Sequence, residues 1–178
     1  MLIARELRKT NIAEYILYMW QTEDSLRACS FNPELIEQQL VNRFNVEGAA
    51  KKELIDWYTN LAVMMEKEHV QEKGHIQVLV NLVNDLNEFH LKMLEVRNDP
   101  EYVRLYQLNA GTISELRSND DSKNEVSVCL NALYGFMLLR LKSSEISSET
   151  QETIANFARQ IGHLSARYIQ FENDDFEF

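Results

Sequence analysis

The sequence is poor in the residues that make tight turns. Its 178 residues include five glycines and two prolines, about 4% of the chain where ordinary usage gives about 12%. A chain with so few turn residues has little with which to build hairpins, so β-rich folds are disfavoured. Its 22 leucines equal its valines and isoleucines combined, a balance typical of helices. Together these counts predict an all-α protein.

Cysteine and positive charge are also scarce. Cys29 and Cys129 stand inside helical patterns and match no metal or redox spacing, so we interpret both as reduced core thiols. The chain has 18 basic and 28 acidic residues, a net charge of −10, and no basic cluster. Phosphate binding depends on Lys and Arg. We therefore expect neither nucleic acid nor an anionic membrane surface as a partner.

A long apolar run is missing as well. Residues 1–9 contain no stretch that could serve as a signal peptide. The longest apolar stretch, residues 126–141, is interrupted by polar side chains and is shorter than the roughly 20 residues that span a membrane. With two reduced thiols, this pattern predicts a cytoplasmic protein.

Helical periodicity is what the sequence does contain. Apolar residues three and four apart mark seven segments, near residues 12–29, 33–44, 48–73, 75–97, 100–117, 123–142 and 148–170. Short links between helices of similar length predict antiparallel neighbours. The segment 123–142 is apolar nearly all round, which predicts that it lies at the centre. We expect a single-domain antiparallel helical bundle of about six or seven helices over residues 1–170, followed by an acidic, frayed C-terminal tail at 171–178.

Local signals predict where several helices begin and end. Asn32 directly before Pro33 is typical of a helix N-terminus. Ser122 and Ser148 are predicted to cap two later helices. Gly74 is predicted to stop the helix over 48–73 in a left-handed conformation.

Two Glu-x-x-His pairs are the nearest approach to a catalytic motif. Glu66 with His69 and Glu72 with His75 have this spacing, which di-iron bundles use on two separate helices. Here both pairs fall within ten residues, and one continuous helix turns Glu66 and His75 to opposite sides. The sequence also has no nucleophile elbow or Gly-rich phosphate loop. It therefore predicts no metal and no cofactor, indicates no catalytic residue, and leaves any enzymatic activity open. His90, on an apolar face, is interpreted as a hydrogen-bonded core residue.

Polar residues at core positions are more informative. Glu23 lies on an apolar stripe, one turn from Trp20 and four residues before Arg27, a spacing that allows an ion pair. Asn131 and Tyr134 belong to the helix expected at the centre, where an unpaired amide costs about 1–3 kcal/mol. Two interpretations stay open, namely bonds that fix the core or the wall of a polar pocket. The candidate wall consists of Trp20, Glu23, Arg27, His75, Asn131 and Tyr134.

Four stretches carry a family resemblance. They are residues 12–21 (IAEYILYMWQ), 72–77 (EKGHIQ), 129–140 (CLNALYGFMLLR) and 145–150 (EISSET), and they spread over most of the chain. They resemble a family of small all-helical bacterial proteins known as a domain of unknown function. The resemblance implies a soluble helical protein of the bacterial cytoplasm and brings no activity, cofactor or catalytic residue.

Two functions remain open at this point. The first is a non-catalytic interaction or scaffold protein that binds a protein partner or forms a homo-oligomer. It predicts an exposed apolar patch, which we expect on the helix near 12–29 or near 48–73. The second is a small-molecule-binding bundle with a polar pocket between helices. A metal-dependent enzyme is the third alternative.

Overall fold

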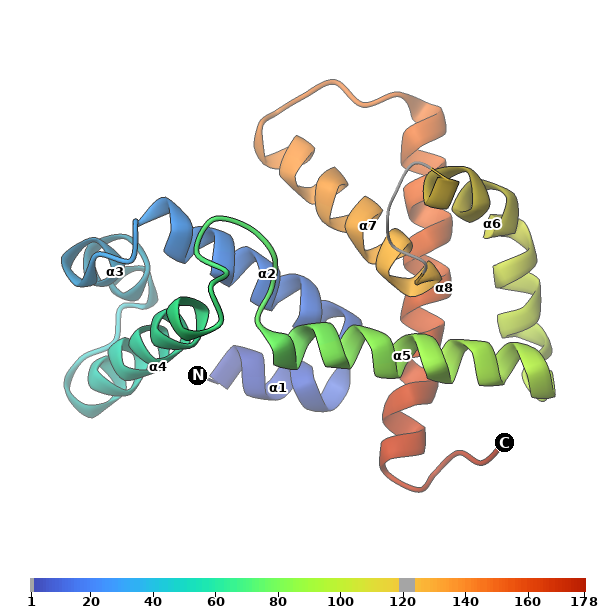
Figure 1. The fold of residues 1–178 in the computed structure, drawn as a ribbon, viewed down its shortest axis with the longest axis horizontal. Helices are drawn as coiled ribbons and strands as arrows, with labels where there is room; N and C mark the ends of the chain where they lie inside the picture. Colours follow the sequence, from blue (N-terminus) through green and yellow to red (C-terminus); the bar gives the residue numbers. More distant parts are fainter. Residues whose placement is uncertain (1, 119–123) are drawn as a thin grey trace. The chain divides into compact units, whose positions relative to one another are not determined.

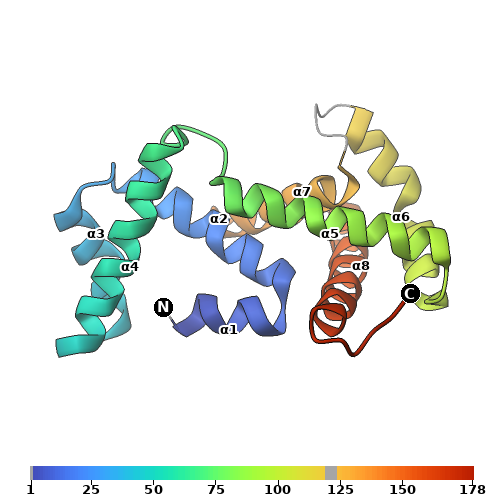
Figure 2. The ribbon, with the colours of Figure 1, turned by 60° about the horizontal axis from the view of Figure 1, so that its bottom comes forward.

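The computed structural model describes residues 2–118 and 124–178, and its regular elements there are all helices (Figures 1 and 2). They are α1 (Leu2–Thr10), α2 (Ile12–Ala28), α3 (Pro33–Gln39), the short 3-10 helix η1 (Val41–Phe44), α4 (Gly48–Lys67), α5 (Gln77–Val96), α6 (Pro100–Ser118), α7 (Glu125–Leu141) and α8 (Ser148–Glu172). The all-α prediction is confirmed. The helix α1 was not among the predicted segments, and it makes eight α-helices in the described part of the chain.

The chain forms two compact units. The first comprises Met1–Arg8 and Tyr15–Asn81, and the second comprises Lys9–Glu14 and Leu82–Phe178. A single domain over residues 1–170 stays a prediction, because compactness alone does not say whether each unit folds independently.

The first unit is built from α1, most of α2, α3, η1, α4 and the loop that leads into α5. The helix α3 contacts η1 and α4, and α4 also contacts η1. The predicted start of α3 is confirmed, because the Asn32 side chain accepts hydrogen bonds from the N–H groups of Glu34 and Leu35, with Pro33 as the first helical residue. Its apolar core includes Ile16, Met19, Leu26, Ile36, Val41, Leu54, Leu61 and Met65.

The helix α4 ends before the predicted position. His69 takes the left-handed conformation with φ +58°, its N–H donates to the carbonyl of Glu66, and the N–H of Val70 donates to that of Met65. These two bonds form a Schellman motif. The prediction that the helix reaches residue 73 and stops at Gly74 is therefore wrong, and Gly74, with φ +87°, lies in the following loop.

The second unit is organised around α8. This 25-residue helix contacts both α6 and α7 (Figure 1), and α6 also contacts α7. The buried residues of α7 are confined to its first half, so the expectation of a central helix holds for that half alone. Core residues of this unit include Leu86, Met93, Tyr102, Leu105, Ile113, Val126, Leu130, Phe157, Ile161 and Leu164.

Two predicted caps are corrected here. Ser122, predicted to cap the helix that starts near 123, lies outside the described residues. The cap of α7 is Asn124, whose side chain accepts from the N–H of Ser127 at 2.8 Å. The cap of α8 is Ser147 rather than the predicted Ser148, and it accepts from the N–H of Thr150 at 3.2 Å.

Candidate functional site

Four of the six residues predicted to wall a polar pocket lie together in the first unit. Trp20, Glu23 and Arg27 come from α2, and His75 comes from the loop before α5. The rings of Trp20 and His75 are stacked with centroids 4.4 Å apart. The Glu23 side chain is fully buried, and its carboxylate lies 2.5 Å from Nδ1 of His75 and accepts from the N–H of Ile76 at 2.9 Å. We call these four residues the loop clamp.

Arg27 completes the loop clamp in a way that the spacing did not predict. Its Nη1 pairs with Asp24 at 2.7 Å, while its Nη2 donates to the carbonyl oxygens of Val70 at 2.9 Å and Gly74 at 2.5 Å. The predicted ion pair between Glu23 and Arg27 is therefore wrong. Both side chains turn instead to the loop over 70–76, where Glu23 satisfies the buried N–H of Ile76 and Arg27 binds two carbonyl oxygens nearer the surface.

The other two predicted wall residues belong to the second unit. Asn131 and Tyr134 both lie on α7. The Asn131 side chain is exposed and that of Tyr134 is half-buried. The expectation of a buried Asn131 amide is wrong, because Asn131 is exposed on a part of α7 that the other helices of the second unit cover only partly.

The polar groups of the loop clamp hold the loop over 70–76 against α2. The carboxylate, imidazole and guanidinium of the clamp are bonded to one another or to the backbone of the adjacent loop. Over residues 2–118 and 124–178, no three His, Cys, Asp or Glu side chains are grouped so that they could hold a metal ion. Arg27 Nε is buried without a hydrogen-bond partner among the described residues, whereas both Nη atoms of this guanidinium are bonded.

A second buried polar cluster surrounds Asp99, and sequence reasoning missed it. The Asp99 carboxylate is 5% exposed and accepts from the N–H of Tyr102 at 3.0 Å, which makes it the cap of α6. It also lies 2.8 Å from Nε2 of His163 and 2.7 Å from Nε of Arg167, both on α8. Burial alone raises the pKa of Asp99, but the three donors outweigh burial and bring the pKa down to about 2. The sequence Asp99-Pro100 indicates the start of a helix, whereas the partners of Asp99, which lie more than 60 residues further along the chain, cannot be found from the sequence.

His90 lies in the same unit as a fully buried side chain. Its Nδ1 is 2.5 Å from the hydroxyl of Tyr102 and its Nε2 is 3.3 Å from the carboxylate of Glu125, which also binds Arg117 at 3.0 Å. Burial lowers the pKa of His90, and the neighbouring Glu125 opposes that shift only in part. The interpretation of His90 as a hydrogen-bonded core residue is confirmed.

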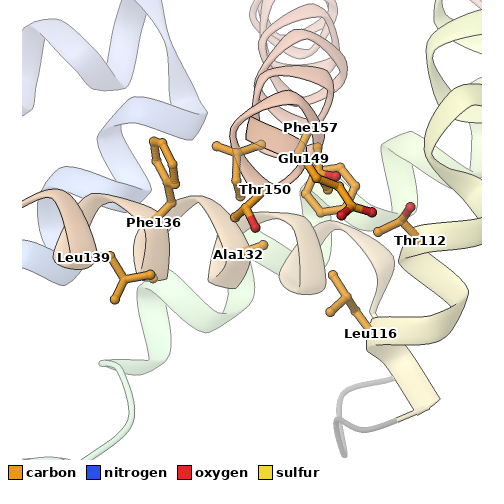
Figure 3. Close-up of a pocket in the computed structure, with 11 residues that line it drawn as sticks. Thr112, Leu116, Ala132, Phe136, Leu139, Glu149, Thr150 and Phe157 are labelled. Carbon is orange, nitrogen blue, oxygen red and sulfur yellow. The ribbon is translucent and has the colours of Figure 1, made fainter. Parts of the chain in front are cut away.

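An apolar groove of about 420 Å³ lies among α6, α7 and the first turns of α8 (Figure 3). Ala132 and Gly135 form part of the lining from α7, with Phe136 and Leu139 beside them. Figure 3 shows Glu149 of α8 on the side of the groove toward α6. An added Cβ at Gly135 meets no atom within 4 Å, so this glycine leaves open space in the lining.

Two side chains that line this groove, Leu116 and Leu139, are exposed apolar residues, and Leu141 lies further along α7. Leu116 of α6 is 40% exposed, and Leu139 and Leu141 of α7 are 43% and 65% exposed. The helix α4 exposes Val63 and Met64 as well, within one of the two segments in which a patch was expected. The exposure on α7 was not expected, because its apolar sequence predicted burial on all sides.

Comparison with known proteins gives a family and no more. No curated protein and no solved structure is significantly similar to this chain. In the described part of the chain, every helix is too short or too polar to cross a membrane. A family model described as "Domain of unknown function (DUF4924)" matches residues 1–175, which cover nearly all of the sequence, and the chain belongs to this family.

Proposed function

We propose that this chain is a non-catalytic helical interaction protein that self-associates through the second half of α7 and the groove beside it. The observation that carries the proposal is the mismatch between the sequence of α7 and its burial. Val126, Val128, Cys129 and Leu130 are buried, yet none of the residues 131–141 is. An apolar helix whose second half is only partly buried within its own unit gains free energy when a further surface removes it from water.

The shape of this surface favours a second copy of the chain as its occupant. Phe136 and Leu139 stand beside the hollow that Ala132 and Gly135 leave open (Figure 3). A two-fold axis through α7 sets the protruding side chains of one copy against the hollow of the other. Gly135, which has no side chain, permits close approach of the partner backbone.

The charges at the rim also favour a second copy. Arg140 and Lys142 are exposed at the end of α7, and Glu145 and Glu149 are exposed just before and within the first turn of α8. A surface that carries both signs side by side is self-complementary under two-fold symmetry, because the bases of one copy meet the acids of the other.

We also propose a location in the bacterial cytoplasm. The family resemblance supports it, and both Cys29 and Cys129 are free and buried, as is usual in a reducing compartment.

Native mass spectrometry and light scattering after size exclusion test the proposal. The wild type is expected to be a dimer, and Leu139→Glu is expected to be monomeric with an unchanged circular dichroism spectrum. Val63→Glu is the matched control, since Val63 is 39% exposed on α4 and lies outside the groove. A monomeric wild type at its highest soluble concentration contradicts the proposal, and so does a dimer that Leu139→Glu leaves intact.

A second pair of variants tests the hollow itself. Gly135→Leu fills the groove and is expected to weaken the dimer, whereas Gly162→Leu is expected to leave it unchanged. Both glycines lie inside helices and have no atom within 4 Å of an added Cβ. Equal dimer dissociation constants for the two variants contradict the role of the hollow.

The alternative of a small-molecule site with a polar wall stays a prediction. The same native spectra test it, because a retained ligand adds a reproducible mass that is lost on unfolding. A bare polypeptide mass in every charge state contradicts that alternative.

A further inference from the structure

The segment after α8 turns back along the second unit (Figure 2), and its aromatic side chains gather around one residue of α5. Phe89 is 5% exposed. Its ring centroid lies 5.4 Å from Tyr168 and 5.3 Å from Phe171 on α8, and 6.0 Å from Phe176 and 5.1 Å from Phe178. The prediction that residues 171–178 fray concerns motion and stays a prediction, but these residues have a defined place to dock.

Each of the last three residues meets a different side chain. The Lys92 ammonium lies 4.2 Å from the centroid of Phe178, and the Arg167 guanidinium lies 5.5 Å from that of Phe176. Between them, the Asn98 side-chain amide donates to the backbone carbonyl of Glu177 at 3.0 Å. Cations over aromatic faces attract the rings. The hydrogen bond from the Asn98 side chain to the Glu177 carbonyl fixes the position of the segment along the site.

Residues outside the segment hold Arg167, one of the side chains that contact it. Arg167 is held by Asp99 at 2.7 Å and by Gln170 at 2.9 Å, and Phe89 is buried in α5. A hollow of about 250 Å³ lies beside Phe178 and is lined in part by Lys92 and Tyr168. We call Phe89, Lys92, Asn98, Arg167 and Tyr168 the aromatic cradle.

We propose that the aromatic cradle is a binding site for extended peptide segments of the pattern Phe-x-Phe, and that residues 176–178 occupy it as a tethered ligand that a partner protein's segment displaces. Residues 173–178 form no helix or strand, and Phe176 and Phe178 are only half-buried. A segment from another protein can make the same side-chain contacts and so replace residues 176–178. The proposal goes beyond self-association through α7 and uses other residues of the second unit.

A peptide titration tests this proposal on the full chain. The probes are a fluorescent peptide of sequence NDDFEF, which copies residues 173–178, and a control peptide NDDAEA. A variant with Phe176→Ala and Phe178→Ala removes both rings from the aromatic cradle while the segment stays attached to the chain. It is expected to bind NDDFEF about tenfold more tightly than the wild type does, because a short tether holds the native segment at an effective concentration in the millimolar range. The control peptide is expected not to bind.

Any one of three results contradicts the proposal that the cradle binds such peptides and holds residues 176–178 as a tethered ligand. In the first, the emptied variant binds NDDFEF no better than it binds NDDAEA. In the second, the wild type and the variant bind NDDFEF equally well, which means that the native segment does not occupy the cradle. In the third, the labelled peptide binds but unlabelled NDDFEF fails to displace it.

A single surface variant gives a test that does not depend on the folding of the double variant. Lys92 is exposed, so Lys92→Ala keeps the core intact. Loss of its contact with Phe178 is expected to speed chymotrypsin cleavage next to Phe176 about two- to fivefold. Lys52→Ala, at an exposed position on α4, is the control and is expected to leave the rate unchanged. Equal cleavage rates for the two variants contradict the proposal.

Discussion

Replacement of Asp99 by asparagine isolates the electrostatic part of the link between α6 and α8. Asparagine still accepts from the N–H of Tyr102 and still caps α6. It does not carry the charge that attracts Arg167 and His163 from α8. The expected loss of stability therefore comes from the loss of the negative charge, which weakens the two ion pairs and the charge-assisted part of the bond from Tyr102, and not from the loss of the cap itself.

The pKa of Asp99 gives the size of its contribution to the free energy of unfolding. It lies at about 2, against an ordinary value of 3.8, and one unit corresponds to about 1.4 kcal/mol. The charged carboxylate in this nearly buried site therefore stabilises the folded chain by about 2 kcal/mol at neutral pH. Because the folded pKa is the lower one, this contribution is complete above the unfolded pKa and disappears as the pH falls through the folded pKa. About half of it is gone at pH 3.

Urea unfolding followed by circular dichroism at pH 7, 5 and 3 measures the effect. Asp99→Asn is expected to be about 2 kcal/mol less stable than the wild type at pH 7 and pH 5, with the gap roughly halved at pH 3. Glu101→Gln is the control, because Glu101 pairs with Arg104 on the exposed surface of the same helix, where such pairs contribute little. A gap that is absent at pH 7, or that does not narrow on acidification, refutes the account of Asp99.

Three further predictions concern the buried histidine, a surface glycine and the loop clamp. Burial holds the pKa of His90 below its ordinary value, so the wild type is expected to lose stability as the pH falls below about 6.5. His90→Gln is expected to flatten that dependence in thermal unfolding. Gly162→Ala is expected to stabilise the chain by about 0.5–1 kcal/mol in urea unfolding, because the added methyl meets no atom within 4 Å in a helix interior. Glu23→Gln keeps an acceptor for the N–H of Ile76 but removes the charge beside His75. It is expected to cost about 1–3 kcal/mol and to expose the loop over 70–76 to limited proteolysis.

Helix starts were readable from the sequence where the signal is local. The pairs Asn32-Pro33 and Asp99-Pro100 both begin helices in the structure, because a cap bonds to residues two or three positions away. The end of α4 was not readable. Gly74 was available for a left-handed stop, yet the chain uses His69, and the position of the stop depends on how the following loop is fastened to α2.

The loop clamp shows what periodicity says about buried polar residues. A polar residue on an apolar stripe must be buried and therefore must find a partner. For Glu23 this reasoning gives burial, which the structure shows, but the candidate wall of six residues also included Asn131 and Tyr134, which lie in the other unit. The reasoning did not identify the partners, which are backbone groups of Val70, Gly74 and Ile76. Spacing within one helix favours pairs within that helix, whereas a loop more than 40 residues away is placed by the fold as a whole.

The helix α7 shows what apolar periodicity cannot predict, and this concerns the proposed function. An all-round apolar pattern predicts that a helix is covered, but it does not say whether the cover belongs to the same chain. Within the second unit, the fully buried residues of α7 all lie in its first half. The second half also carries Gly135, which no close contact and no left-handed backbone require, and which weakens a helix by about 1 kcal/mol relative to alanine. A helix that keeps both a partly exposed apolar face and a glycine is better explained by a partner that packs closely against it than by folding within its own unit alone.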